Sequence, residues 1–465
     1  MILDQYRMNW NYPTSMRVGV GRIAELAEAC SQLGMRAPLL CTDPGLAALP
    51  MIDAALRQCR DAGLKAGLFS AIKGNPTGSN VMDGVAAFKT GGHDGVIAFG
   101  GGSALDAGKA IALMVGQDRP LWDFEDVGDN ASRVNVAGMA PVVAVPTTAG
   151  TGSEVGRASV ITDDMAHIKR IIFHARMLPA LVILDPELTV GLPAKITAAT
   201  GMDALSHSLE AFCSPLFHPM AEGIALEGMR LVQQYLPRAV AQGGDVEARL
   251  QMLVASSMGA TAFQRGLGAM HALAHPLGAL YDAHHGLLNA VLMPYVLVAN
   301  RGAIEPQMEK MARYLALPGG GFEAVLEWVL ALRSEVGIPH SLGEIGIDDA
   351  RIEQVGRMAE VDPSAGTNPI GFSAVQYSAL FEKALRERGA VQQASDTGGG
   401  WLPLPFMGEG LGREENLWFI PRPEPPARLP VPARRRCPLP PPAPLPAAGR
   451  WCTPARPAAR HPVAR

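Results

Sequence analysis

Four side chains in the second half of the chain have the types and spacing of a metal site. Asp203 and His207 lie four residues apart in a segment with apolar residues at helical spacing, so both project from one face of a helix. His271 and His285 follow in the histidine-rich segment HALAHPLGALYDAHHG. One carboxylate and three imidazoles suit Fe²⁺, Zn²⁺ or a similar divalent ion. Such a set leaves room for a substrate oxygen, which indicates a catalytic metal site rather than a structural one.

The alternative is that these residues have no shared role. An Asp and a His four residues apart are more often a surface pair or a helix cap. The cluster of His271, His275, His284 and His285 is harder to explain in this way, because the whole chain has 11 His and these four lie among Leu, Ala and Gly. An unpaired imidazole is costly to bury in such surroundings. The cluster therefore favours the metal interpretation.

Two polar turns in the first half of the chain have the features of a phosphate site. In GVIAFGGGSALDAGKAIA a predicted strand runs through a glycine turn into a helix, and the N–H groups at such a helix start bind phosphate. The turn in VVAVPTTAGTGSE also follows a predicted strand and suits the phosphate, ribose or amide groups of a nucleotide. A plain strand-to-helix connection is the alternative for the first turn. The candidate residues are Gly101, Gly102, Ser103, Thr147, Thr148 and Thr151.

A carboxylate ends another predicted strand, in LLCTDPGL. Asp43 at this place can accept hydrogen bonds from an adenosine ribose and would repel a 2′-phosphate. A turn residue or a helix cap is the competing interpretation. The position alone leaves both open.

The elements that must position these residues differ between the two halves of the chain. Short apolar runs alternate with helical patterns over the first 185 residues, which predicts βαβ units around a parallel sheet with Rossmann-like nucleotide binding. After Pro186 we find only helical periodicity. We expect an α/β domain over residues 1–185 and an all-helical metal domain over 186–390. The predicted strands are residues 37–42, 66–69, 95–99, 142–146 and 181–184, and the predicted helices are 22–33, 46–62, 79–90 and 103–115.

Composition narrows the class of protein. A chain of 465 residues, 48% hydrophobic, fits two ordinary globular domains. Its start lacks the features of a signal peptide, and no apolar run approaches the roughly 18 residues that span a bilayer. The six Cys show neither CxxC spacing nor a disulfide framework, so we expect a cytoplasmic protein. Of the net charge of −4, residues 391–465 carry +5 (ten Arg against five Asp and Glu), which leaves −9 on residues 1–390 and argues against nucleic-acid binding.

The last part of the chain, residues 391–465, has a different composition. About one-third of residues 421–465 are Pro, with many Arg and Ala and no Lys. Such a segment cannot bury enough apolar surface to offset its ordering entropy, so we expect a disordered tail. A Pro-rich docking segment is one interpretation. A non-native extension is the other, and the composition favours it.

Together, these motifs resemble the iron-containing (group III) alcohol dehydrogenase family. TDPGL, GGGSALDAGKA, PTTAGTGSE, ATGMDALSHSLEAF and HALAHPLGALYDAHHG appear in the family's order, and the resemblance covers about residues 8–388. It implies a dehydroquinate-synthase-like fold and a homo-oligomer, a dimer or larger. It also implies an active site between a nucleotide-binding domain and a helical metal domain. The metal ligands that it implies are Asp203, His207, His271 and His285; His275 would lie near the nicotinamide, and the residues contacting NAD would be Asp43, Gly101, Gly102, Ser103, Thr147, Thr148, Thr151 and Lys169.

Three features depart from the family pattern. Gln264 and Arg265 stand where many members have Ser-Asn, His284 replaces a common Pro, and the tail has no counterpart. The first two lie near the expected substrate pocket. One hypothesis is that Arg265 pairs with a carboxylate on an acidic substrate; the alternative is that it is exposed or binds a carbonyl at a helix end.

The function that the resemblance implies is reversible hydride transfer between a short primary alcohol and NAD (EC 1.1.1.-). Fe²⁺, or Zn²⁺, would act as a Lewis acid on the alcohol or aldehyde oxygen, and His275 could shuttle the proton. One alternative is a semialdehyde reductase for an acidic substrate such as 4-hydroxybutyrate. A metal-dependent hydrolase is another, but it leaves the two polar turns without a role.

Overall fold

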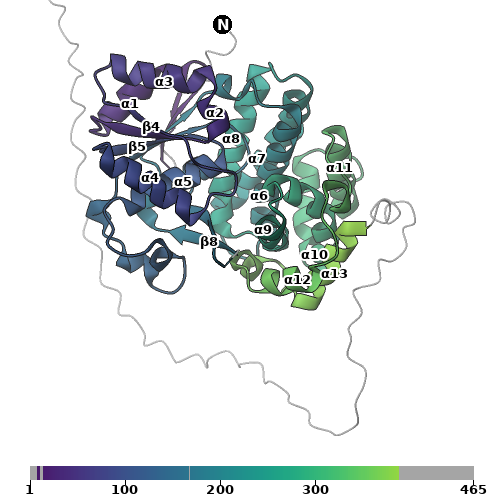
Figure 1. The fold of residues 1–465 in the computed structure, drawn as a ribbon. Helices are drawn as coiled ribbons and strands as arrows, with labels where there is room; N and C mark the ends of the chain where they lie inside the picture. The colour runs from purple at the N-terminus through teal and green to yellow at the C-terminus, as the bar shows by residue number, and fades with distance from the viewer. Residues whose placement is uncertain (1–7, 11–13, 167, 387–465) are drawn as a thin grey trace, which may run out of the picture. The chain divides into compact units, whose positions relative to one another are not determined.

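The computed structural model describes residues 8–10, 14–166 and 168–386, which belong to one compact unit (Figure 1). The strands are β1 (Met8–Trp10), β2 (Ser15–Val18), β3 (Pro38–Cys41), β4 (Gly67–Phe69), β5 (Gly95–Gly100), β6 (Val142–Pro146), β7 (Ala158–Asp163), β8 (Ile168–Phe173) and β9 (Leu181–Leu184). The helices of this half are α1 (Leu26–Gln32), α2 (Pro44–Ala47), α3 (Pro50–Asp61), α4 (Gly78–Thr90) and α5 (Gly102–Met114).

A seven-stranded sheet organises the first half, in the order β1-β2-β9-β6-β5-β3-β4. β1 pairs antiparallel with β2, and the other pairs are parallel. In the pairing of β5 with β6, Gly100 lies opposite Pro146. The two strands therefore end at the same edge, and the loops that follow them leave the sheet side by side.

Alternate residues of the central strands face opposite helical layers. Val143 and Val145 of β6 pack in a core with residues of α1 and α3. Ala144, between them, packs in the core that includes residues of α4 and α5 on the other face of the sheet (Figure 1). β5 and β6 are buried along their whole length, as expected for a parallel sheet covered on both faces.

From Ala194 onward, the described chain is helical. The elements are α6 (Ala194–Cys213), α7 (Pro219–Ala241), α8 (Val246–Ala262), α9 (Ala269–Tyr281), α10 (His285–Tyr314), α11 (Gly321–Glu335), α12 (Ile352–Glu360) and α13 (Ala374–Arg386). α6 is buried over almost all of its length and packs against α7, α8 and α10. It is therefore the central helix of this half and a rigid support for the residues that it carries.

One helix among the described residues, α10, is long and apolar enough to cross a membrane by length and composition. Its 18-residue window has a mean hydropathy of 1.4, and 67% of that window is buried inside the protein. Polar residues such as Asn289 and Asn300 interrupt it, so the sequence of α10 contains no uninterrupted apolar run of that length. A helix covered by its own protein is the kind expected in a hydrophobic core.

The architecture agrees with the predicted one, an α/β half with a parallel sheet followed by a helical half. All five predicted strands are present, but β1, β2 and the antiparallel pair of β7 and β8 were not predicted. Four cysteines of the described chain are free and buried, namely Cys30, Cys41, Cys59 and Cys213. The predictions for residues 391–465 lie outside the described residues.

Candidate active site

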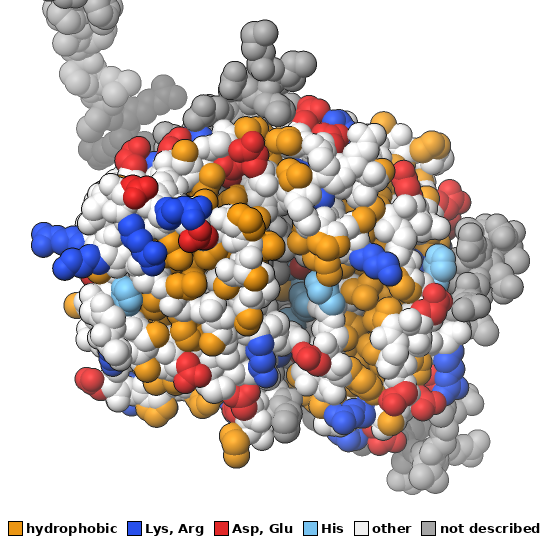
Figure 2. Space-filling model, turned by 45° about the horizontal axis from the view of Figure 1, so that its top comes forward, with side chains coloured by type: hydrophobic (Ala, Val, Ile, Leu, Met, Phe, Trp, Pro, Cys, Tyr) orange, Lys and Arg blue, Asp and Glu red, His pale blue; other side chains and the backbone are white. Residues whose placement is uncertain are grey.

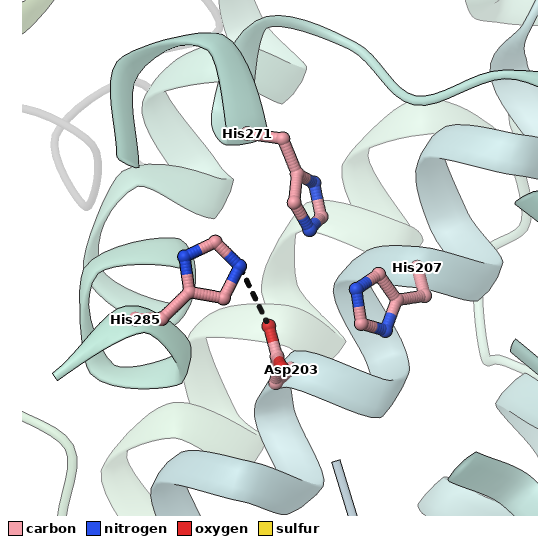
Figure 3. A group of neighbouring side chains, drawn as sticks. All are labelled: Asp203, His207, His271 and His285. Carbon is pink, nitrogen blue, oxygen red and sulfur yellow. Dashed lines mark ion pairs between the residues drawn. The ribbon is translucent and has the colours of Figure 1, made fainter. Parts of the chain in front are cut away.

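The four predicted metal ligands come together where three helices meet. Asp203 and His207 lie on α6, His271 on α9, and His285 is the first residue of α10. One donor atom from each residue lies within 4.8 Å of the others, and the four side chains point toward one another in Figure 3. His285 is half-buried and the other three are buried. A compact group of these donor types has the chemistry of a divalent metal site that remains accessible from one side.

Glycines allow the helices around the ligands to approach closely. A Cβ on Gly286 of α10 would lie 2.5 Å from the carbonyl oxygen of Ala199 and 2.9 Å from the Cβ of Asp203. A Cβ on Gly259 of α8 would lie 3.1 Å from the Cβ of His207. A larger residue at Gly286 would therefore push α10, and His285 with it, away from α6.

A carboxylate that the sequence analysis missed orients His271. Glu210 lies three residues after His207 on α6 and accepts a 2.7 Å hydrogen bond from Nδ1 of His271. It also accepts 2.7 Å hydrogen bonds from the backbone N–H groups of Gly268 and Met270. Because an ionised carboxylate can only accept, the neutral ring of His271 carries its proton on Nδ1 and its lone pair on Nε2. Hydrogen bonds of this kind hold metal-binding histidines in one orientation.

Burial controls the charge of the imidazoles. Desolvation lowers the pKa of His207 to about 4 and holds the pKa of His285 well below its usual value. Both rings are therefore neutral at neutral pH, which is the form that binds a metal. Burial also opposes the charged form of His271, but the carboxylates of Glu210, Asp203 and Asp362 together outweigh this effect and raise the pKa of His271. Neutral ring nitrogens and one carboxylate oxygen fit Fe²⁺ or Zn²⁺.

His275 lies beside this group without joining it. Its ring stacks on that of His285, with centroids 5.5 Å apart and 10° between the planes. Its Nδ1 lies 2.8 Å from Oδ2 of Asp362, and the other oxygen of Asp362 accepts from the N–H of Ser364. Burial opposes the charge of Asp362, but His275 and the hydrogen bonds from Ser364 together outweigh it and lower the pKa of the carboxyl. Asp362 thus fixes the ring of His275 at the edge of the group.

The two polar turns lie against each other at one edge of the sheet. A Cβ on Gly102 would lie 2.5 Å from Cγ2 of Thr151, and a Cβ on Gly101 would lie 3.4 Å from Cγ2 of Thr148. The start of α5, with its unpaired N–H groups, therefore adjoins the hydroxyl-rich turn. Of the six residues predicted here, Gly101, Gly102 and Ser103 follow β5, and Thr147, Thr148 and Thr151 follow β6.

Asp43 lies at the same sheet edge, after β3. Its Oδ1 accepts a 2.9 Å hydrogen bond from the N–H of Leu46 and caps α2. The capping role that the sequence allowed is therefore present. A contact of its other oxygen with a ribose stays a prediction.

Lys169, on β8, reaches from the first half of the chain to helix α9. Its Nζ would lie 2.9 Å from a Cβ on Gly278. Burial lowers its pKa to about 8, opposed by carboxylates that include Asp106 on α5 and Asp282 after α9. The ammonium group thus lies between the two halves of the chain.

Sequence patterns of one family match both halves of the chain. The pattern described as "Iron-containing alcohol dehydrogenase" matches residues 13–186. The pattern described as "Fe-containing alcohol dehydrogenase family, C-terminal" matches residues 197–385. The chain belongs to the iron-containing alcohol dehydrogenase family.

Individual relatives agree with this membership of the iron-containing alcohol dehydrogenases. The chain is 38% identical over 384 residues to the 4-hydroxybutyrate dehydrogenase of Cupriavidus necator, covering 80% of this chain and 99% of the relative. It is 33% identical over 384 residues to the NAD-dependent methanol dehydrogenase of Bacillus methanolicus, covering 81% and 100%. A crystal structure of a 1,3-propanediol oxidoreductase superposes with a TM-score of 0.76 at 35% identity, covering 80% of this chain and 97% of that one. The chain is thus an oxidoreductase, and the hydrolase interpretation has no support.

The hypothesis that Arg265 recognises an acidic substrate is wrong. This side chain is buried, and its Nε donates a 2.6 Å hydrogen bond to the carbonyl of Leu216. Its Nη1 donates a 3.1 Å hydrogen bond to the carbonyl of Phe212, near the end of α6, and lies 3.4 Å from a carboxylate oxygen of Glu222. The guanidinium therefore binds backbone carbonyls at a helix end, which was one of the alternatives that the sequence left open.

On the face shown in Figure 2, histidine side chains gather in a hollow near the middle of the molecule. His284, which departs from the family pattern, is exposed, and its ring nitrogen accepts from the N–H of Leu287 at the start of α10. The residues of this site that sequence analysis missed are Glu210, Asn289 and Asp362.

Proposed function

We propose that this member of the iron-containing alcohol dehydrogenases is an NAD-dependent alcohol dehydrogenase and aldehyde reductase that acts on short primary alcohols. The convergence of Asp203, His207, His271 and His285 carries this proposal. The name of the 33% identical NAD-dependent methanol dehydrogenase supports the choice of cofactor. Residues 1–185 would bind NAD and residues 186–390 would hold the metal. A cytoplasmic location and a homo-oligomeric state stay predictions.

Fe²⁺, or alternatively Zn²⁺, would be held by the four side chains of this group. When bound, such an ion acts as a Lewis acid toward the oxygen of an alcohol or aldehyde. The chain prepares the site by keeping His207 and His285 neutral and by fixing the tautomer of His271 through Glu210. The four donors therefore need little reorganisation to bind an ion.

The nucleotide would lie across the edge of the sheet where β3, β5 and β6 end. Ligands of open α/β sheets bind outside the carboxyl ends of the strands. The N–H groups at the start of α5 would bind the pyrophosphate, with the Thr-rich turn beside them. Asp43 would accept from the ribose and disfavour NADP, and Lys169 would contact the cofactor near α9. The nicotinamide would then face His275.

A proton must leave the alcohol when hydride is transferred to NAD. Asp362 holds the Nδ1 side of His275, which leaves Nε2 of the neutral ring free to accept a proton. His275 is only half-buried, so its proton can pass to solvent. We propose His275 as the general acid and base, with Asp362 as its positioning residue.

An acidic substrate is the second candidate, because the 38% identical relative is a 4-hydroxybutyrate dehydrogenase. Arg265 does not serve such a substrate, since its guanidinium binds carbonyl groups at a helix end. Any preference for an acidic substrate must therefore come from residues other than Arg265.

The test is a panel of aldehydes reduced with NADH or NADPH by the metal-loaded full chain, followed at 340 nm. We expect turnover with NADH that depends on the metal. A higher kcat/KM for butyraldehyde than for succinic semialdehyde supports the general alcohol dehydrogenase, and the reverse order supports the semialdehyde reductase. No turnover of any aldehyde with either nucleotide would contradict both.

A further inference from the structure

A buried amide borders the four proposed ligands. Asn289 is fully buried on α10, one helical turn after His285. Its Nδ2 lies 2.9 Å from Oδ1 of Asp203, 3.1 Å from Nε2 of His271 and 3.2 Å from Nε2 of His285. A single amide nitrogen is therefore within hydrogen-bond distance of three of the four donor atoms.

The two ends of this amide have different surroundings. The NH₂ end has three acceptors, which are all donor atoms of the proposed metal site. The carbonyl oxygen Oδ1 is buried and has no hydrogen-bond partner among the described residues. A buried carbonyl without a partner costs free energy, so a purely structural role would leave the side chain poorly satisfied.

Another asparagine on the same helix shows what a structural role looks like. Asn300 is also buried, and it exchanges two hydrogen bonds with Asn368, of 2.9 and 2.8 Å. Both ends of the Asn300 amide are used, and its partner links α10 to the segment after η11 (Pro363–Thr367). Asn289 differs, because it reaches α6 and α9 only through the proposed ligands Asp203 and His271.

We propose that Asn289 is a fifth polar group of the metal centre and presents its amide oxygen to a bound ion. Without an ion, the two N–H groups of its amide can donate to two at a time of the three nearby lone pairs, on Asp203, His271 and His285, and keep these donors together. A bound cation takes those lone pairs and repels the positive end of the amide dipole. The N and O ends of an amide occupy nearly the same positions after a half-turn. Turning the amide breaks no bond of Oδ1, since it has none.

This inference rests on the proposed metal site and predicts the effect of three substitutions on metal affinity. Asn289→Leu keeps the approximate size and removes the amide, and it should weaken Co²⁺ binding by about 10- to 100-fold, as loss of groups around metal ligands does. Asn289→Asp places oxygen at both ends and should bind Co²⁺ at least as tightly as the wild type. Asn300→Leu is the matched control and should leave the affinity unchanged.

The measurement is competition for Co²⁺ between a chelator and the metal-stripped full chain, with circular dichroism to check folding. Wild-type affinity in Asn289→Leu, or a loss in Asn289→Asp as large as in Asn289→Leu, would overturn the role of the amide oxygen. If Asn289→Leu does not fold, Asn289→Asp alone decides: affinity at or above that of the wild type supports the role, and weaker binding overturns it. A wild-type chain that binds no Co²⁺ would instead refute the metal site itself.

Discussion

Replacing Glu210 tests how the chain holds its metal ligands. The carboxylate accepts three hydrogen bonds, from Gly268, Met270 and His271. In Glu210→Gln the amide oxygen can take the place of Oε2 and keep the hydrogen bonds from Gly268 and His271. The N–H of Met270, which donates to Oε1, then loses its acceptor. One unpaired buried donor costs about 1–3 kcal/mol of folding stability. The weaker hold on His271 should lower metal affinity by about 10- to 100-fold.

Two measurements on the metal-stripped chain check this estimate. Denaturant unfolding gives the loss of stability, and competition with a chelator for Zn²⁺ gives the metal affinity. Glu154→Gln is the matched control, because Glu154 is a buried carboxylate whose hydrogen bond from Ser257 involves none of the four proposed ligands. We expect the control to bind Zn²⁺ like the wild type. Unchanged stability and unchanged Zn²⁺ affinity in Glu210→Gln would refute the reasoning.

Three further predictions concern the nucleotide and the proton. Asp362→Asn removes the carboxylate that holds His275 and should lower kcat about 10-fold or more with little change in the KM for NAD; an unchanged kcat would contradict the positioning role. Lys169, whose pKa is lowered to about 8, loses its positive charge as pH rises through that value, so the Kd of NADH measured by fluorescence should increase above pH 8. Lys169→Met should bind NADH weakly at every pH, and a flat wild-type profile would argue against the contact. Asp43→Gly should narrow the ratio of kcat/KM for NAD over NADP, whereas an unaltered ratio would leave Asp43 as a helix cap only.

The group of four side chains that the structure brings together could be predicted from the sequence because its signal is local. Asp203 and His207 share one helix face by spacing alone, and the density of histidines marks the segment around His271. Strands such as β5 and β6 could also be predicted from the sequence, because strands that are buried on both faces form continuous apolar runs. The hairpin of β7 and β8 was missed although alternate residues of β7 are buried, which is the period of a half-buried strand.

The residues that support the ligands could not be predicted, because their contacts are distant along the chain. Glu210 and His271 are 61 residues apart, and Asp362 and His275 are 87 apart. For Arg265 the sequence left both substrate recognition and a carbonyl contact at a helix end open. An unusual residue near a ligand suggested substrate recognition, whereas the fold uses it to bind carbonyl groups at the end of α6. A single sequence does not indicate which way such a side chain points.

A metal titration of the stripped full chain tests the central claim most directly. NADH-dependent aldehyde reduction should be absent without metal and should rise with added Fe²⁺ or Zn²⁺ until one ion per chain is bound. His285→Ala, which removes one of four donors, should neither bind the ion tightly nor recover activity. Full activity in the stripped chain, or wild-type activity and metal content in His285→Ala, would contradict the claim that Asp203, His207, His271 and His285 form the catalytic metal centre.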